Sequence, residues 1–215
     1  MRVLSGKKHC SLNIEQFRTQ INAYHTVHVD VGTGCGRFIL NSAKKDNRTF
    51  YIGIDLCAEN MYESATKAVK VMKKQSRGNI MFVVSSIENP PYELVGIADS
   101  ITVILPWGSL RDGLVKGVHG VINNLRLLGK DGSSLQIIIG YSNDRESYEI
   151  YTHSLPVLSM EYLESLKQLY YEKRILINNI KVIGNNDLKM IDSGWAKRLA
   201  YGVKREIFCL DCIYI

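Results

Sequence analysis

The chain has 215 residues, a length typical of one large domain or of a domain with an appendage. Its 46% hydrophobic residues, with only 4 Pro and 17 Gly, exclude a disordered or collagen-like chain. Its formal net charge is +6, no stretch approaches the roughly 18 apolar residues of a membrane span, and the segment MRVLSGKKHC lacks the apolar region of a secretion signal, so we expect a cytoplasmic protein.

Apolar side chains follow either strand-like or helical spacing over the first two thirds of the chain. Short apolar runs that end in glycine, proline or polar residues predict strands at residues 27–32, 49–55, 79–86, 100–108 and 134–142. Helical spacing before and between them predicts helices at residues 12–23, 36–45, 58–75 and 109–129. Strands that alternate with helices indicate an α/β fold with a parallel sheet.

The last third follows another pattern. Residues 159–173 predict an amphipathic helix, and residues 175–184 and 204–215 predict two strands that run as a hairpin-like pair. The polar segment 185–195 between these strands predicts a loop.

No internal repeat, low-complexity segment or interdomain linker interrupts this order. We therefore expect a single domain over residues 1–215, with a short N-terminal extension at 1–11. The predicted sheet has seven strands, is mostly parallel and has long loops after its fifth and sixth strands.

The positive charge gathers in three stretches that hold basic residues and no acidic ones: 1–9, 67–77 and 197–205. Together they contain 12 of the 27 Lys and Arg residues within 29 positions. A solvated surface would explain each stretch alone. Clustering without interleaved acids favours a polyanionic partner, with nucleic acid as the leading candidate.

The five cysteines are an odd, scattered set, which indicates reduced thiols in a chain that is not secreted. Cys209 and Cys212 form a CxxC motif, but side chains three positions apart on a strand point to opposite faces. With no second CxxC and no nearby histidine, we expect no metal site.

The strongest local pattern is VDVGTGCGR at 29–37, which follows a predicted strand and opens a predicted helix. Its three glycines let the backbone approach a ligand and leave N–H groups at a helix N-terminus. Asp30, just before the loop, is a candidate partner for a ligand ammonium group. The spacing GxGxG departs from the GxGxxG dinucleotide fingerprint, but an NAD-binding or other nucleotide-binding fold stays the alternative.

Polar residues also follow the next two predicted strands. Asp55 ends the second strand, where it is placed to accept hydrogen bonds from both ribose hydroxyls of an adenosine ligand. Ser86, Ile87 and Glu88 follow the third strand, where an adenine would lie. With Asp30 and the glycines, this set resembles the site of class I (Rossmann-like) methyltransferases, which implies S-adenosyl-L-methionine as cofactor and S-adenosyl-L-homocysteine as product.

The segment LPWG at 105–108 ends the fourth predicted strand. Enzymes that methylate an exocyclic base amine typically have Asn or Asp at the position that Leu105 fills, so exocyclic amine chemistry is disfavoured. No cysteine lies on this strand to attack a pyrimidine carbon. A ring nitrogen such as adenine N1 has its own lone pair and needs proximity and orientation, for which Trp107 offers a stacking surface.

The other tryptophan, Trp195, lies in SGWAKRLAYG, between a polar loop and a basic stretch. An aromatic ring beside a loop and beside the cations Lys197 and Arg198 suits a stacking platform for a base. The alternative is a tryptophan of the hydrophobic core.

The segments HVDVGTGCGR, FYIGID, ADSITVILPWGSL and SGWAKRLAYGVKR resemble those of the NpmA/KamB family of aminoglycoside-resistance methyltransferases. The similarity runs over essentially the whole chain and is closest to the NpmA branch. The LPWG and WAKRLAYG segments are the most specific part, because generic class I methyltransferases lack them. The resemblance implies methylation of N1 of adenine 1408 in the decoding A-site of 16S rRNA, with the assembled 30S subunit as substrate and aminoglycoside resistance as the consequence.

The resemblance also implies roles for individual residues. Trp107 and Trp195 would stack on both faces of the flipped adenine, as the catalytic pair. The expected cofactor site comprises Asp30, Gly32, Thr33, Gly34, Arg37, Asp55, Ile87, Glu88, Ile104, Leu105, Pro106, Ser109, Ser193 and Gly194. The expected RNA contacts are Lys67, Lys70, Lys73, Lys74, Glu146, His153, Arg198 and Arg205, with Glu146 supporting the extruded nucleotide.

Three positions depart from the family pattern. Cys35 stands where the glycine loop often has Asp, His153 where Arg is expected, and Val203 where the family has a basic residue. We expect these departures to weaken individual RNA contacts and to leave the cofactor site in place.

The expected protein is therefore a monomeric rRNA methyltransferase. One alternative is a class I methyltransferase that acts on another RNA, such as tRNA, or on a small molecule. The other is a non-catalytic RNA-binding protein with the same fold.

Overall fold

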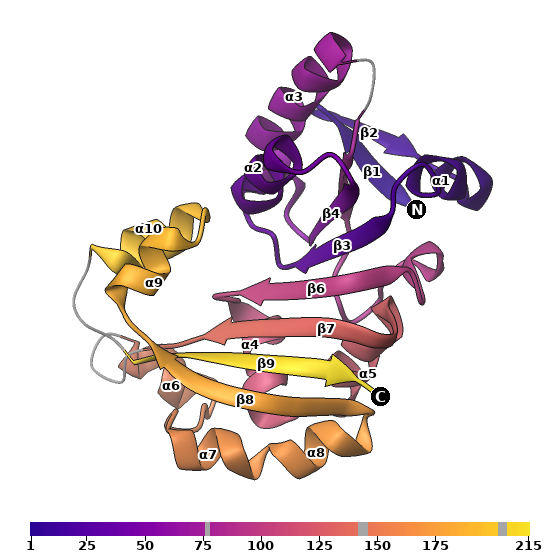
Figure 1. The fold of residues 1–215 in the computed structure, drawn as a ribbon. Coiled ribbons are helices and arrows are strands. Elements are labelled where there is room, and N and C mark those ends of the chain that lie inside the picture. Colours follow the sequence, from indigo (N-terminus) through magenta and orange to yellow (C-terminus); the bar gives the residue numbers. More distant parts are fainter. Residues whose placement is uncertain (76–77, 142–145, 202–205) are drawn as a thin grey trace.

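The computed structural model describes residues 1–75, 78–141, 146–201 and 206–215, although not the side chains of residues 73–75. Within these ranges the strands form one nine-stranded sheet in the order β2-β1-β5-β4-β3-β6-β7-β9-β8 (Figure 1). The strands are β1 (Arg2–Ser5), β2 (Lys8–Ser11), β3 (Thr26–Val31), β4 (Thr49–Asp55), β5 (Ile80–Val84), β6 (Ala98–Ile104), β7 (Gly129–Ile139), β8 (Ile175–Ile183) and β9 (Ile207–Tyr214).

The middle of the sheet is parallel. β5, β4, β3, β6 and β7 pair in parallel with one another, as strands joined by crossover helices do. β9 runs antiparallel to both β7 and β8, in agreement with the hairpin-like pattern predicted for the last third. The predicted α/β class with a mostly parallel sheet is confirmed.

The predicted number of seven strands is wrong, because residues 1–11 add two more to the described sheet. β1 and β2 form a hairpin, and Val3 of β1 pairs antiparallel with Val83 of β5. Each of these strands has four residues, and all four of β2 are exposed, so no alternation of apolar and polar residues marks them.

The helices of the described chain are α1 (Ile14–Ile21), α2 (Arg37–Lys45), α3 (Ala58–Gln75), α4 (Gly108–Lys116), α5 (His119–Leu128), α6 (Ser147–Thr152), α7 (Met160–Ser165), α8 (Lys167–Glu172), α9 (Asn185–Met190) and α10 (Gly194–Ala200), with a 3₁₀ turn at Tyr92–Leu94. They lie on both faces of the sheet. On β5, Phe82 and Val84 pack with α2 and α3, whereas Val83 packs with the cluster that includes α1, α4 and α5.

Three predicted boundaries need correction. The helix predicted at 109–129 is α4 and α5, because Gly117 ends α4 in the left-handed conformation with φ of 70°. The helix predicted at 159–173 is α7 and α8, which meet at Leu166. The loop predicted at 185–195 contains α9 and the start of α10, since helices of six or seven residues have too few apolar positions to reveal a helical period.

The buried cysteines belong to the core. Cys209 and Cys212 are free thiols and pack in different apolar clusters, in agreement with the opposite faces expected from their spacing. Among the described residues, no group of three or more His, Cys, Asp or Glu side chains is placed to hold a metal ion. No helix in the described part of the chain combines the length and the hydropathy needed to cross a membrane.

The parallel strands place several predicted site residues at one edge of the sheet. β3, β6 and β7 point toward the side of the molecule where α9 and α10 lie (Figure 1). The glycine loop follows β3, Asp55 ends β4, and the LPWG segment follows β6. Ligands of open α/β sheets bind outside the carboxyl ends of such strands.

Candidate active site at the carboxyl edge of the sheet

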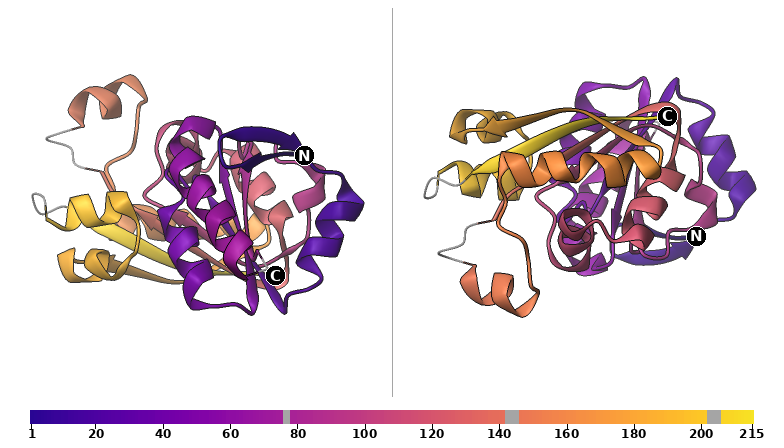
Figure 2. Two further views of the ribbon diagram at one scale, coloured as in Figure 1. Left: turned by 90° about the horizontal axis from the view of Figure 1, so that it is seen from above. Right: turned by 90° about the horizontal axis from the view of Figure 1, so that it is seen from below.

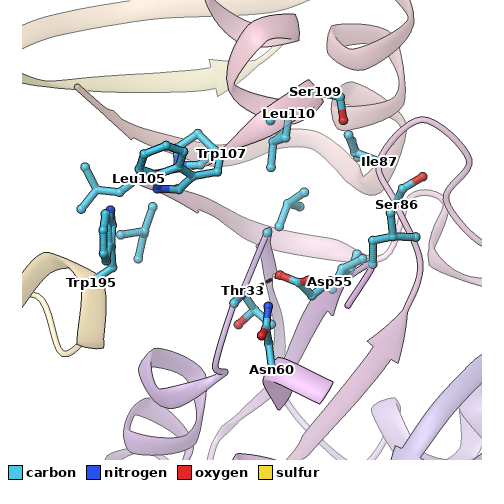
Figure 3. Close-up of a pocket in the computed structure, with 18 of the residues that line it drawn as sticks. Thr33, Asp55, Asn60, Ser86, Ile87, Leu105, Trp107, Ser109, Leu110 and Trp195 are labelled. Atoms are coloured by element: carbon cyan, nitrogen blue, oxygen red, sulfur yellow. Dashed lines mark hydrogen bonds between the residues drawn. The ribbon is translucent and has the colours of Figure 1, made fainter. Parts of the chain in front are cut away.

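A cavity of about 650 Å³ lies at the carboxyl ends of β3, β4, β5 and β6 (Figure 3). Its wall includes many of the predicted site residues, from five separate stretches of the sequence. These are Gly32, Thr33, Gly34, Asp55, Ile87, Glu88, Ile104, Leu105, Pro106, Trp107, Ser109, Ser193 and Trp195.

Three predicted cofactor residues do not line this cavity. Asp30 is buried below the glycine loop, and Arg37 is exposed at the start of α2. A Cβ atom built on Gly194 would lie 3.7 Å from Cys35 Sγ and 3.8 Å from Arg37 Nη1, so α10 begins against the glycine loop. A direct cofactor contact by these three residues stays a prediction.

The glycine loop forms the wall of the cavity next to β3. Gly34 has φ of 55°, and a Cβ atom built on it meets no other atom within 4 Å, so the loop leaves open space there. Gly36 also has positive φ, and a Cβ atom on it would lie 2.3 Å from the Phe82 ring. Position 36 needs glycine for its positive φ and its packing against Phe82, whereas glycine at position 34 suits the positive φ and leaves room for a ligand against the loop.

Asp55 ties this loop to the end of β4. Its Oδ2 accepts from the Gly34 N–H at 2.7 Å, and its Oδ1 accepts from the Cys57 N–H at 2.9 Å. Burial raises the pKa of this carboxyl group, and hydrogen bonds from the backbone at Cys57, Gly34 and Leu56 oppose that shift. A carboxylate has about four acceptor sites, so Asp55 keeps capacity for hydroxyl donors of a ligand.

Glu88 lies on the β5 side of the cavity. Burial alone would raise its pKa, but hydrogen bonds from Ser109, from its own backbone N–H and from Ser86 together hold the pKa below the ordinary value. The Asn124 side chain donates to the Ile87 carbonyl at 2.9 Å and to the Glu88 carbonyl at 3.0 Å. Asn124 of α5 therefore fixes the loop that carries Glu88, a role that no sequence motif indicated.

Asp30 belongs to a buried polar chain behind the loop. Thr102 Oγ1 donates to Asp30 Oδ1 at 2.6 Å, and His28 Nε2 lies 3.1 Å from the same Thr102 oxygen. His28 Nδ1 lies 2.8 Å from Ser100 Oγ. Burial raises the pKa of Asp30 to about 6 and lowers the pKa of His28 to about 4. Because the Thr102 proton is given to Asp30, His28 Nε2 donates to Thr102 and Nδ1 accepts from Ser100.

The two tryptophans lie together at one end of the cavity, while Ser86, Ile87 and Ser109 lie toward the other (Figure 3). Trp107 is 44% exposed and Trp195 is 37% exposed, so the alternative of Trp195 as a core residue is not favoured. Their ring centroids are 5.7 Å apart at 72°, an edge-to-face contact. A base between two parallel rings needs roughly 7 Å, so at least one indole must turn before a base enters.

Leu105 shapes the wall beside the tryptophans (Figure 3). It is a non-glycine residue with φ of 50°, held by its N–H bond to the Ile138 carbonyl at 2.7 Å. Its side chain packs in the cluster that includes Ala196 and Leu199 of α10. Strain of about 1–3 kcal/mol at such a residue persists only where the surroundings hold it, and here it turns the chain from β6 toward Trp107.

The predicted RNA contacts whose side chains the structure describes lie outside the cavity. Lys67 and Lys70 are exposed on α3, and Lys67 forms an ion pair with Glu63. Arg198 is exposed on α10, and Glu146 precedes α6. His153, at the end of α6, lies within hydrogen-bond distance of Asp112, with 2.5 Å between Nδ1 and Oδ2. The predicted contacts Lys73, Lys74 and Arg205, and the departure at Val203, lie outside the described side chains.

Sequence reasoning missed several lining residues. Most of them are neighbours of a predicted motif residue, and Asn60, on α3, has no motif around it. The missed residues are Val31, Cys35, Ile54, Leu56, Asn60, Ser85 and Leu110, and Ser86 was noted only as a place where adenine would lie.

Comparison with known proteins decides between the open alternatives for this site. A family profile described as NpmA, 16S rRNA (adenine(1408)-N(1))-methyltransferase, matches residues 2–213. The chain belongs to the NpmA family. The predicted resemblance is confirmed, and the NAD-binding alternative is set aside.

Individual NpmA-family relatives match this chain over nearly their whole length. A 16S rRNA (adenine(1408)-N(1))-methyltransferase of Escherichia coli is 36% identical over 97% of this chain and 96% of its own. A variant of the enzyme of the same name from Catenulisporales acidiphilia, crystallised with its cosubstrate SAM, superposes with a TM-score of 0.88, at 30% identity over 100% of this chain and 96% of its own. The aminoglycoside resistance methyltransferase NpmB1 superposes with a TM-score of 0.82, at 29% identity over 100% and 99%. The predicted methyltransferase fold is confirmed.

Proposed function

We propose that this NpmA-family chain methylates N1 of adenine 1408 of 16S rRNA in the 30S subunit with S-adenosyl-L-methionine, and so gives aminoglycoside resistance. One observation supports the proposal above the others. Two exposed tryptophans meet at one end of a cavity whose other parts offer the Asp55 and Glu88 carboxylates. Such a cavity serves a flat aromatic substrate at one end and an adenosine-containing ligand along the rest.

The residues of the cavity fit the cofactor. The open space at Gly34 admits the ligand against the backbone, and Asp55 next to it accepts hydrogen bonds from the ribose hydroxyls. Ile87 and Ser109 bound the part where the adenine lies, beside Glu88. When bound, the cofactor supplies an electrophilic methyl group on a sulfonium sulfur.

Trp107 and Trp195 hold the target base. Extruding an adenine costs a few kcal/mol, and each aromatic stack returns roughly 1–3 kcal/mol, so two stacks together offset the cost. The rings must separate from their edge-to-face contact to accept the base. Leu105 offers no side-chain acceptor for an exocyclic amine, whereas N1 attacks with its own lone pair. The protein therefore acts by proximity and orientation, without a general base.

The exposed cations orient the enzyme on rRNA. Lys67, Lys70 and Arg198 bind phosphates, and Glu146 contacts the extruded nucleotide. Phosphate contacts fix register without reading sequence, so the ribosomal surface selects the base by shape. We propose that a monomer performs this reaction, in the cytoplasm where 30S subunits are found.

Transfer of a labelled methyl group from the cofactor tests the substrate. Three RNAs are offered separately to the purified protein: assembled 30S subunits, protein-free 16S rRNA and bulk tRNA. We expect rapid labelling of the 30S subunits at one base, identified by mass spectrometry of nuclease digests. Labelling of tRNA in preference to 30S subunits would contradict the proposal.

A further inference from the structure

A buried arginine lies behind one of the two tryptophans. Arg111 follows Trp107 by one turn of α4, and its side chain is only 4% exposed. Its Cζ lies 5.4 Å from the centroid of the Trp107 ring and 5.9 Å from that of Tyr141. Arg111 lies over the indole ring but is not among the residues that line the cavity.

Two carboxylates hold this guanidinium in place. Arg111 Nε donates to Asp112 Oδ1 at 3.0 Å, and Nη1 donates to Glu149 Oε2 at 3.0 Å. Charge-assisted hydrogen bonds of this kind fix the plane of a guanidinium, which then stacks on aromatic faces as an ammonium group does not. Burial without these partners would leave an uncompensated charge in the core.

The same contacts join α4 to α6. Glu149 lies on α6, and His153 Nδ1 at its end lies 2.5 Å from Asp112 Oδ2. Lys116 Nζ also donates to the His153 carbonyl. α6 projects from the body of the molecule at the end where α9 and α10 lie (Figure 2). The contacts with α4 therefore fix a helix that has no buried residue of its own.

We propose that Arg111 is a positioning residue for methyl transfer: it holds the plane of the Trp107 indole from behind and couples that plane to α6. The inference rests on the proposed stacking role of Trp107. The guanidinium covers one face of the Trp107 indole and fixes its orientation, so the other face is free to stack on the base. Trp195 is then the ring that turns to admit the base. Through its ion pair with Glu149, the same guanidinium fixes the position of α6, and of Glu146 before it, relative to the base.

A fluorescence experiment tests the contact without any need for activity. The chain has two tryptophans, so Trp195→Phe leaves Trp107 as the sole indole. In this background, Arg111→Lys keeps the charge and replaces the planar guanidinium over the ring with an ammonium group. We expect the rate constant for acrylamide quenching of Trp107 to rise about twofold or more, and its fluorescence anisotropy to fall. An unchanged quenching constant would overturn the inference.

Arg126 provides the matched control. Its Cζ lies over the Tyr214 ring, 4.8 Å from the centroid, and it forms an ion pair with Asp131, so it is also a largely buried arginine beside an aromatic ring. It lies on α5 and does not line the cavity. Arg126→Lys should lower the melting temperature as Arg111→Lys does, but leave Trp107 quenching unchanged.

Kinetics on 30S subunits give the second readout, with the tryptophans intact. We expect Arg111→Lys to lower kcat about tenfold, which corresponds to about 1.4 kcal/mol, with cofactor affinity unchanged by calorimetry. Arg126→Lys should keep the wild-type kcat. If both variants keep the wild-type kcat, Arg111 is a structural ion pair and the inference is wrong.

Glu149→Gln keeps the test decisive if Arg111→Lys does not fold. Its side chain is 41% exposed, so the fold tolerates the change, and the link between Arg111 and α6 is lost. We expect a raised KM for 30S subunits and greater Trp107 quenching in the Trp195→Phe background. No change in either would overturn the coupling to α6. A wild-type protein that fails to methylate 30S subunits would contradict the proposed function instead, and the quenching result would still decide the inference.

Discussion

Single residues at the cavity wall hold the local structure and face the ligand at the same time. Asp55 fixes the Gly34 N–H and keeps acceptor capacity toward the cavity. Sequence reasoning found this residue because a carboxylate at the end of the second strand is a recognisable position. It could not find Asn124, which acts through its amide on the carbonyls of another loop.

Asp55→Ala should weaken cofactor binding. The change leaves the ribose hydroxyls and the Gly34 N–H without an acceptor, at a cost of roughly 1–3 kcal/mol, or about five- to 150-fold in Kd. Calorimetric titration measures the affinity. Asp46→Ala is the control, because Asp46 also accepts a backbone N–H, from Arg48, but lies outside the cavity. Equal affinities of the wild type and Asp55→Ala would contradict the assigned role.

His28 should make the stability depend on pH. Its pKa is lowered from 6.5 to about 4 by burial, so its contribution to the free energy of unfolding is complete above pH 6.5 and lost as the pH falls to 4. Asp30 acts in the opposite direction, because a pKa raised to about 6 stabilises the fold as the pH falls.

A His28→Asn variant separates the two effects, because it removes the titration of His28 and keeps that of Asp30. The wild type should lose up to about 3 kcal/mol of its stability advantage over His28→Asn between pH 7 and pH 4. Urea unfolding at several pH values measures the difference. A constant difference between the wild type and His28→Asn over this pH range would show that His28 is not held neutral by burial.

At the scale of elements, α10 carries Trp195, but other residues of the helix hold it against the rest of the protein. Ala196, Leu199 and Ala200 are its buried residues, and they pack with Leu105. The sequence predicted the tryptophan as a stacking platform but placed it in a loop. A seven-residue helix with three small or apolar contacts has too little periodicity to predict.

Trp195→Ala should therefore abolish methylation and preserve the fold. Losing one of two stacks leaves the cost of base extrusion uncompensated, so we expect turnover to fall roughly 100-fold or more. The melting temperature and cofactor affinity should stay near wild type. Leu199→Ala, a buried change on the same helix, should instead lower the melting temperature by several degrees. Trp195→Phe should keep part of the activity, because a smaller ring still stacks. Full activity in a folded Trp195→Ala protein would refute the stacking role.

At the scale of the molecule, the parallel core and the β8–β9 edge were predictable from the sequence, and the β1–β2 edge was not. Short apolar runs that end in glycine, proline or polar residues identify β3 to β7. Parallel strands are buried on both faces, so their sequences are almost uninterrupted runs of apolar residues. β1 and β2 have four residues each, and β2 buries none of them, so pairing with β5 rather than sequence pattern determines them. The edge-to-face contact of the tryptophans likewise cannot be predicted from the sequence pattern, because Trp107 and Trp195 are far apart in the sequence.

The positive charge on α3 should increase the affinity of the whole protein for the 30S subunit. Lys67→Gln with Lys70→Gln should weaken 30S binding and reduce its salt dependence by up to about two units of slope, one for each lost phosphate contact. Filter binding across a salt series measures both. The control pair is Lys130→Gln with Arg174→Gln, which removes the same charge at the amino edge of the sheet. If both pairs leave binding and slope unchanged, α3 presents a solvated face and not an RNA contact.

Primer extension on 16S rRNA from cells that express the protein tests the central claim most directly. Methylation of N1 blocks Watson–Crick pairing, so reverse transcriptase should stop next to adenine 1408. Cells that express the wild-type chain should show this stop, and cells that express Trp195→Ala at the same level should not. Read-through at adenine 1408 with the wild-type protein, or a stop at another base, would contradict the account.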